Sequence, residues 1–101
     1  AEYGEELGLS LQELTPDLAQ SLDIDEKTGI LVTEVKANGI AARSGLQRGD
    51  LILEAGAGNT RQPVKTIKDF NKILKNSGKK ANILLLVKSG KQIKFLLLKR
   101  K

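Results

Sequence analysis

The C-terminal stretch LLLVKSGKQIKFLLLK constrains the fold most, because it contains two apolar runs separated by a short polar turn. We predict strands over residues 82–88 and 92–99, joined as a tight hairpin at Ser89-Gly90. Three earlier segments also have strand character: residues 7–14, in which apolar and polar side chains alternate, residues 29–35 and residues 51–54. The glycine-rich stretch 55–64 between them and the hairpin is predicted to be a loop.

Helix signals separate these strands. A threonine followed by a proline predicts a helix over residues 15–22, because the hydroxyl caps free N–H groups and proline is tolerated at the first helical position. Residues 40–44 predict one helical turn ended by a glycine. The longest helix is predicted to begin at Thr66, which forms a capping box with Asp69, and to end at Gly78. Five or so strands with two helices predict a single α+β domain, a partly open barrel or sandwich.

Composition excludes several chemistries. The 101 residues contain neither cysteine nor histidine, so a Ser-His-Asp triad, a Cys-His pair and the usual zinc sites are impossible within this chain. We therefore expect no catalytic residue, no cofactor and no metal site here. No apolar run reaches the ~18 residues that a bilayer-spanning helix needs, so no membrane span is expected.

Charge is distributed unevenly along the chain. Residues 1–50 hold 10 acidic and 4 basic side chains, whereas residues 51–101 hold 2 acidic and 13 basic ones. A basic interaction domain for nucleic acid or anionic membrane is therefore one possible interpretation. Single-stranded nucleic acid also needs aromatic platforms, and both phenylalanines, Phe70 and Phe95, lie at positions patterned as buried. We keep this interpretation as the alternative, with no nucleic acid expected as the main partner.

Residues 38–53, NGIAARSGLQRGDLIL, carry the most specific pattern. A helical turn, a glycine, a leucine, a Gly-Asp turn and an apolar strand follow one another. This segment resembles the SxAAxxGLxxGDxI pattern of PDZ domains from bacterial HtrA-type serine proteases. GILVTEV before it, TIKDFNKIL after it and the closing hairpin follow that family's order. The resemblance spans residues 6–99, which leaves 1–5 as a lead segment and 100–101 as a basic tail.

The resemblance implies a fold and a site. The implied fold is a five- to six-stranded, partly open antiparallel barrel or sandwich with two main helices. In such domains backbone N–H groups around a glycine bind the C-terminal carboxylate of a peptide, and Leu7-Gly8-Leu9 match that loop. Gly8 then lacks a side chain because the carboxylate must approach the backbone. The implied peptide-binding residues are Glu6, Leu7, Gly8, Leu9, Ser10, Leu11, Ile67, Asn71, Leu74 and Lys75.

The peptide would add to residues 9–11 as an antiparallel strand and contact the helix, with its last side chain among Leu7, Leu9, Ile67 and Leu74. Family members often place a basic residue before the loop, whereas this chain has two glutamates, which would oppose an anion by roughly 0.5–1 kcal/mol each. Lysines at positions 68, 72 and 75 are expected to form a basic rim beside Asn71.

The resemblance also implies a biological setting. It identifies the chain as a regulatory, peptide-binding module of a periplasmic HtrA-type serine endopeptidase involved in protein quality control. The expected partners are protein C-termini or extended segments, together with the protease domain and the other PDZ domain of the same or a neighbouring subunit. The closing hairpin pattern is closer to the second, C-terminal PDZ domain of a two-PDZ protein.

Overall fold

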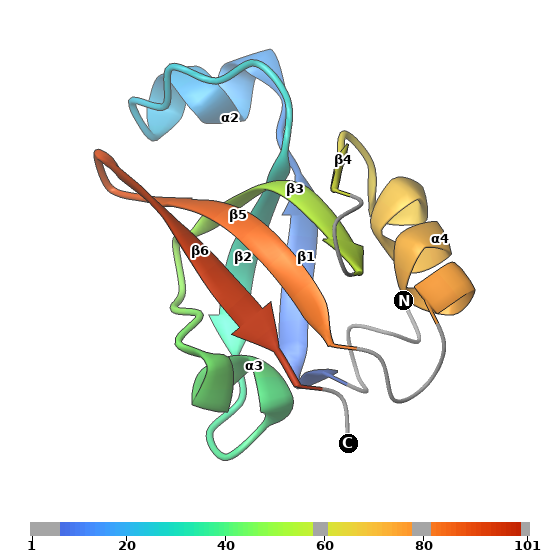
Figure 1. The fold of residues 1–101 in the computed structure, drawn as a ribbon. Helices are drawn as coiled ribbons and strands as arrows, with labels where there is room; N and C mark the ends of the chain where they lie inside the picture. Colours follow the sequence, from blue (N-terminus) through green and yellow to red (C-terminus); the bar gives the residue numbers. More distant parts are fainter. Residues whose placement is uncertain (1–6, 58–60, 78–81, 100–101) are drawn as a thin grey trace.

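The strands form one open antiparallel sheet. The computed structural model describes residues 7–57, 61–77 and 82–99. The strand order in the sheet (Figure 1) is β1 (Leu9–Glu13), β2 (Ile30–Val35), β3 (Leu51–Ala57), β5 (Ile83–Ser89) and β6 (Gln92–Leu98), with the short β4 (Gln62–Pro63) paired to β3. Strands β1 and β6 lie at opposite ends of this order, so the sheet does not close into a barrel. The partly open antiparallel α+β fold is confirmed.

The C-terminal hairpin forms as the sequence predicts. Strands β5 and β6 pair along their whole length, from Ile83 opposite Leu98 to Ser89 opposite Gln92. The turn consists of Gly90 and Lys91, one residue later than predicted, and Gly90 has a φ of +63°. A positive φ is the backbone conformation in which glycine carries no steric penalty. The turn residues therefore match the turn geometry.

The predicted loop over residues 55–64 is wrong in two places. Residues 55–57 continue β3 and pair with β5, with Ala55 opposite Leu85 and Gly56 opposite Leu84. Residues 62 and 63 form β4. Glycine and small residues indicate a loop from local propensity, but pairing with the long apolar strand β5 decides the outcome. Residues 58–60 lie outside the described part of the chain.

Within the described segments, three helices connect the strands. Helix α2 (Pro16–Ser21) begins after Thr15, whose Oγ1 accepts a hydrogen bond from the backbone N–H of Leu18 at 3.1 Å. Helix α3 (Ile40–Ser44) ends at Gly45, which has a φ of +101°. Both boundaries confirm the sequence prediction, because both depend on capping chemistry within a few residues.

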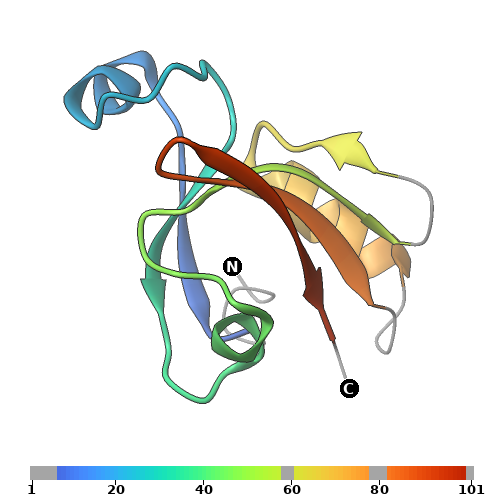
Figure 2. The ribbon, with the colours of Figure 1, turned by 60° about the vertical axis from the view of Figure 1, so that its left-hand side comes forward.

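Helix α4 (Ile67–Ser77) begins where predicted. The Oγ1 of Thr66 accepts a hydrogen bond from the backbone N–H of Asp69 at 3.0 Å. The Asp69 carboxylate accepts from the backbone N–H of Lys65 at 3.2 Å, one residue before the position expected for a capping box. The expected stop at Gly78 falls outside the described residues. Figure 2 shows α4 packed on one face of the sheet.

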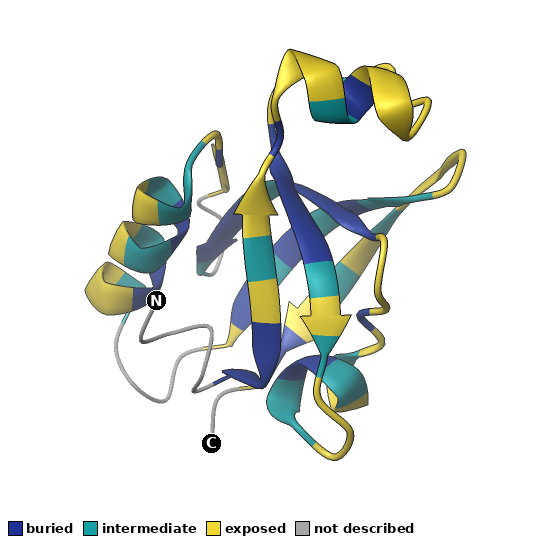
Figure 3. Ribbon diagram, turned by 180° about the vertical axis from the view of Figure 1, so that it is seen from behind, coloured by how far each residue is buried: buried dark blue, intermediate teal, exposed yellow. Residues whose placement is uncertain are grey.

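The main apolar core lies between the sheet and α4. It contains Phe70 and Leu74 of α4 and the inward-facing residues of the strands, among them Ile30, Ile52 and Leu85, all fully buried. Figure 3 shows that buried positions occur on the strands, whereas α4 is mostly exposed or half-buried and contributes buried Phe70 and Leu74. Phe95 was expected to be buried, but 54% of its surface is exposed. That expectation is wrong because Phe95 lies on the outer face of β6.

A second, smaller apolar cluster lies under α2. It consists of the buried residues Leu14, Ala19, Leu31 and Leu51. Ala19 is the buried residue that α2 contributes. The small cluster anchors α2 at the end of the sheet away from α3 (Figure 1).

Candidate functional site

Strand β1 is an edge strand beside helix α4. It pairs with β2, and no other strand of the described segments pairs with it. Helix α4 lies beside its free edge and contacts it (Figure 3). The register of β1 and β2 shifts between Ser10 and Leu11, which marks a β-bulge. An edge strand offers unpaired backbone N–H and C=O groups that a further strand can use. We call the surface formed by β1, Leu7, Gly8 and α4 the β1–α4 site.

A hydrogen bond between distant residues holds the two elements together. The Oε2 of Glu13, the last residue of β1, accepts from the backbone N–H of Ile67, the first residue of α4, at 2.9 Å. A carboxylate at this end of a helix satisfies a free N–H group and interacts favourably with the helix dipole. Sequence reasoning missed this role of Glu13, because 54 residues separate the partners and the sequence carries no local signal for the pairing.

Gly8 has a structural requirement of its own. Its φ is +76°, and a Cβ built there would lie 3.2 Å from the Cα of Gly39. Its carbonyl accepts a hydrogen bond from the backbone N–H of Lys36 at 2.8 Å. The chain entering β1 therefore packs closely against the loop between β2 and α3. A side chain at position 8 would strain this contact whether or not a ligand is bound.

The structure brings most of the predicted site residues together. Leu7, Leu9 and Leu74 are buried members of the main core, and Leu11 and Ile67 pack against it. The polar members lie closer to solvent: Ser10 and Lys75 are exposed and Asn71 is half-buried. Glu6 lies outside the described residues. The predicted apolar members therefore lie in or against the core, and the predicted polar members lie nearer to solvent.

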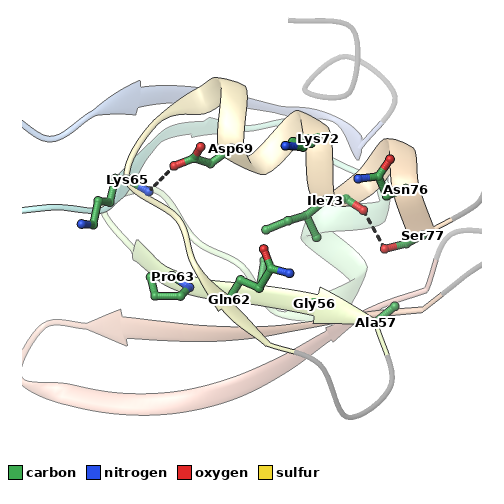
Figure 4. A pocket seen from close by; sticks show the side chains of 11 residues that line it. Gly56, Ala57, Gln62, Pro63, Lys65, Asp69, Lys72, Ile73, Asn76 and Ser77 are labelled. Carbon is green, nitrogen blue, oxygen red and sulfur yellow. Dashed lines mark hydrogen bonds between the residues drawn. The ribbon is translucent and has the colours of Figure 1, made fainter.

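One lysine of the predicted basic rim lines a cavity elsewhere on α4. Lys72 lines a different cavity, of about 820 Å³, between α4 and strands β3 and β4 (Figure 4). Ile73 and Asn76 line the same cavity. The expectation that Lys72 lies beside the β1–α4 site is therefore wrong, because the step of one residue from Asn71 turns its side chain to the other side of the helix. Lys68 and Lys75 remain exposed on α4.

The charged groups of the described residues include an ion pair that shifts two pKa values. Within residues 7–57, 61–77 and 82–99 no three His, Cys, Asp or Glu side chains gather as metal ligands. Among the residues that the structure describes, the shorter of two ion pairs joins Lys88 of β5 to Glu26, with an Nζ–Oε1 distance of 2.8 Å. The hydrogen bond from Lys88 lowers the pKa of the Glu26 carboxyl, and the same bond raises the pKa of Lys88. Nothing in this pair lies near the β1–α4 site.

The family profile of the PDZ domain matches residues 2–88. The chain belongs to the PDZ domain family. Its relatives support the assignment. It is 43% identical over 94 residues to the "Probable periplasmic serine endoprotease DegP-like" of Chlamydia pneumoniae, a match that covers 92% of this chain and 18% of the relative. A protein of the same name from Pseudomonas savastanoi pv. phaseolicola is 39% identical over 90 residues, covering 87% of this chain and 18% of the relative.

Solved structures agree with this PDZ assignment. The HtrA-type protease AlgW with decapeptide superposes with a TM-score of 0.75 at 32% identity, covering 92% of this chain and 27% of that one. The HtrA3 PDZ domain bound to a phage-derived ligand (FGRWV) superposes with a TM-score of 0.73 at 26% identity, covering 94% of this chain and 83% of that one. This PDZ domain spans about a fifth of the length of the curated relatives it matches. The resemblance to PDZ domains of HtrA-type proteases is confirmed.

Proposed function

We propose that this PDZ domain binds an extended peptide segment at the β1–α4 site. The observation that carries the proposal is the free edge of β1 beside α4, with an apolar cluster beneath both. The peptide adds to β1 as an antiparallel strand, and its C-terminal carboxylate accepts hydrogen bonds from backbone N–H groups around Gly8. The side chains of Leu9, Leu11 and Ile67 supply an apolar surface for the peptide.

Two polar residues of α4 border the β1–α4 site and can contact the peptide. Lys75 and Asn71 follow one another along α4 at a spacing of four residues, so they share one side of the helix. Lys75 offers a positive charge and Asn71 both a donor and an acceptor. Two of the solved structures similar to this domain carry peptides, one a decapeptide and one FGRWV. These neighbours support a peptide as the ligand class.

We further propose that this domain serves a periplasmic serine endoprotease of the HtrA type. The names of the relatives support this proposal. In that setting the domain contributes peptide recognition and contacts to other domains, and the hydrolytic residues lie elsewhere in the protein. Its closing hairpin supports the position of a second, C-terminal PDZ domain. No helix in the described part of the chain is long and apolar enough to cross a membrane.

The test is a titration with the pentapeptide FGRWV and its C-terminally amidated twin. This chain contains no tryptophan, so the fluorescence of the peptide's own tryptophan reports binding without background. We expect micromolar binding of the acid and at least tenfold weaker binding of the amide. Equal binding of the twins would contradict carboxylate recognition. If neither twin nor any peptide with another apolar end binds, the site serves contacts between domains instead.

A matched pair of variants locates the ligand on the correct side of α4. Lys75→Gln removes a charge at the margin of the β1–α4 site and should weaken FGRWV binding about two- to fivefold. Lys72→Gln removes the same charge from the same helix, on the side that lines the 820 Å³ cavity, and should leave binding unchanged. A larger effect at Lys72 than at Lys75 would assign the peptide to the cavity between α4 and β3.

The alternative function, binding of nucleic acid or anionic membrane by the basic half, makes a different prediction. Phosphate contacts release counterions, so such binding weakens steeply between low and physiological salt. Strand addition onto an apolar surface changes little over the same range. The salt dependence of each complex therefore separates the two functions.

A further inference from the structure

Strand β6 is the second free edge of the sheet. It pairs with β5, and within the described residues no strand pairs with its other side. Three large apolar residues on its outer face are exposed: Ile93 by 59%, Phe95 by 54% and Leu97 by 40%. They alternate along the strand and therefore share one face. Apolar side chains gathered on an unpaired edge strand are a typical sign of a contact surface, because a solvated edge normally carries charges there.

Helix α3 lies against the C-terminal half of β6 and forms a cavity with it. Leu96 of β6 approaches Gly45 at the end of α3, where a Cβ would lie 3.4 Å from the leucine. The cavity measures about 540 Å³ and is lined by Ile40, Arg43 and Ser44 of α3, by residues 95–97 of β6 and by Lys99. Figure 2 shows α3 beside the end of β6, away from α4. A free strand edge flanked by a helix thus occurs a second time in this domain.

Both charged side chains that line this cavity are basic. Arg43 and Lys99 line it, and no carboxylate does among the described residues. Lys94 lies on the same strand, half-buried. Arg43 donates from its Nε to the carbonyl of Gly39 at 3.4 Å, and within the described residues no hydrogen bond uses the two terminal nitrogens of its guanidinium. The surface therefore suits an anionic partner.

We propose that β6 and α3 form a second docking site, which takes an extended acidic segment of a partner protein. The segment adds to β6 as a strand. Its apolar side chains cover Ile93, Leu97 and the part of Phe95 that the Arg61 guanidinium leaves exposed, and its carboxylates pair with Arg43 and Lys99. This β6–α3 site lies at the opposite edge of the sheet from the β1–α4 site and needs neither Gly8 nor a free peptide C-terminus.

Charge and hydrogen bonding favour this partner over two others. A second copy pairing through β6 would bring Lys91, Lys94 and Lys99 of each copy together with no carboxylate between them. A nucleic acid offers phosphates, but it cannot satisfy alternating backbone N–H and C=O groups along a strand edge. The Phe95 ring, which a base would need for stacking, already carries the Arg61 guanidinium on one face, with 4.7 Å between the Cζ of Arg61 and the ring centroid. An acidic polypeptide satisfies both the charges and the edge.

The probe is an acetylated, C-terminally amidated heptapeptide in which valine alternates with glutamate. Amidation keeps it from using carboxylate recognition at the β1–α4 site. Titrated into the 15N-labelled domain, it should shift the amide signals of residues 93–99 and of Arg43, and leave those of residues 9–11 in place. Two further peptides carry N-methyl groups on all valines or on all glutamates. Strand addition requires that one of these two binds and that the other does not, because alternate N–H groups point to opposite sides.

Matched variants test the charges. Arg43→Gln should weaken the binding of the valine–glutamate peptide about fivefold. Arg48 is an exposed arginine in the turn before β3, and Arg48→Gln should leave this binding unchanged. A twin peptide with glutamine in place of glutamate should bind about fivefold more weakly as well. The proposal is wrong if residues 93–99 do not respond to millimolar peptide, or if both N-methylated peptides bind alike. It is equally wrong if a single-stranded 20-mer oligonucleotide shifts these residues and the peptide does not, or if sedimentation shows that β6 is occupied by a second copy.

Discussion

Glu13 is expected to set the position of α4 beside β1. Its carboxylate accepts the backbone N–H of Ile67 at 2.9 Å, and Glu13 itself is exposed. Loss of a side chain that caps a helix N-terminus costs typically about 1 kcal/mol, and the interaction of a carboxylate with the helix dipole is part of that figure at an exposed site. We expect Glu13→Ala to lower the free energy of unfolding by about 1 kcal/mol, or the melting temperature by about 4–8 °C. Glu13→Gln keeps an acceptor oxygen without the charge and should lose about half as much.

Urea denaturation of the two variants measures this loss, and Glu34→Ala is the matched control. Glu34 is an exposed glutamate on the neighbouring strand β2. Hydrogen exchange supplies a local readout, because the amide of Ile67 should exchange faster in Glu13→Ala than in the parent. The reasoning is refuted if Glu13→Ala is no less stable than Glu34→Ala, or if the Ile67 amide exchanges at the parent rate. Because α4 forms one side of the β1–α4 site, its loosening in Glu13→Ala should also weaken the binding of FGRWV.

Two further predictions concern the backbone and the ion pair. Gly8→Ala should lower the free energy of unfolding by about 1–2 kcal/mol, which is more than the loss caused by Gly90→Ala. Both glycines have a positive φ, but of the two only Gly8 faces a close neighbour, Gly39. Equal losses of the two variants in thermal melts would show that the contact with Gly39 contributes nothing. Glu26→Gln should be less stable than the parent at neutral pH. The lowered pKa of Glu26 means that its contribution is present above the ordinary value of 4.5 and is lost as pH falls through the lowered pKa, so parent and variant should converge in stability below pH 4.5. The raised pKa of Lys88 means that its contribution is lost only as pH rises above 10.5. A difference in unfolding free energy that persists at low pH would contradict this origin.

The sequence predicts those parts of the fold that depend on neighbouring residues. Thr15 and Thr66 cap helices as expected, since a hydroxyl and the N–H groups it accepts lie within one turn. The end of α3 at Gly45 is also predicted, and the hairpin turn is predicted to within one residue, because each depends on a glycine at the turn itself. The site was placed by resemblance to PDZ domains, and the structure groups its apolar members in one cluster.

The features that sequence reasoning missed depend on residues far apart in the chain. Gly56 lies in a strand because Leu84 lies opposite it, although the sequence around it favours a loop. The hydrogen bond between Glu13 and Ile67 joins residues that lie 54 positions apart in the sequence. Phe95 is exposed because a strand at the end of a sheet has one face without a covering layer, and periodicity alone cannot tell the inner face from the outer one. The prediction that Lys72 belongs to the basic rim is wrong, because each step of one residue along a helix rotates the side chain by about 100° around the axis.

The small cluster under α2 is separate from the main apolar core, so the two parts of the domain can unfold separately. Helix α2 contributes buried Ala19 and partly buried Leu18 to this cluster and no residue to the main core, so detaching α2 leaves the main core intact. Local opening of α2 therefore requires far less free energy than global unfolding. Protease cleavage of the native state should begin here, and sequence insertions here should be tolerated. A PDZ domain built in this way can vary its α2 end without disturbing either free edge of its sheet.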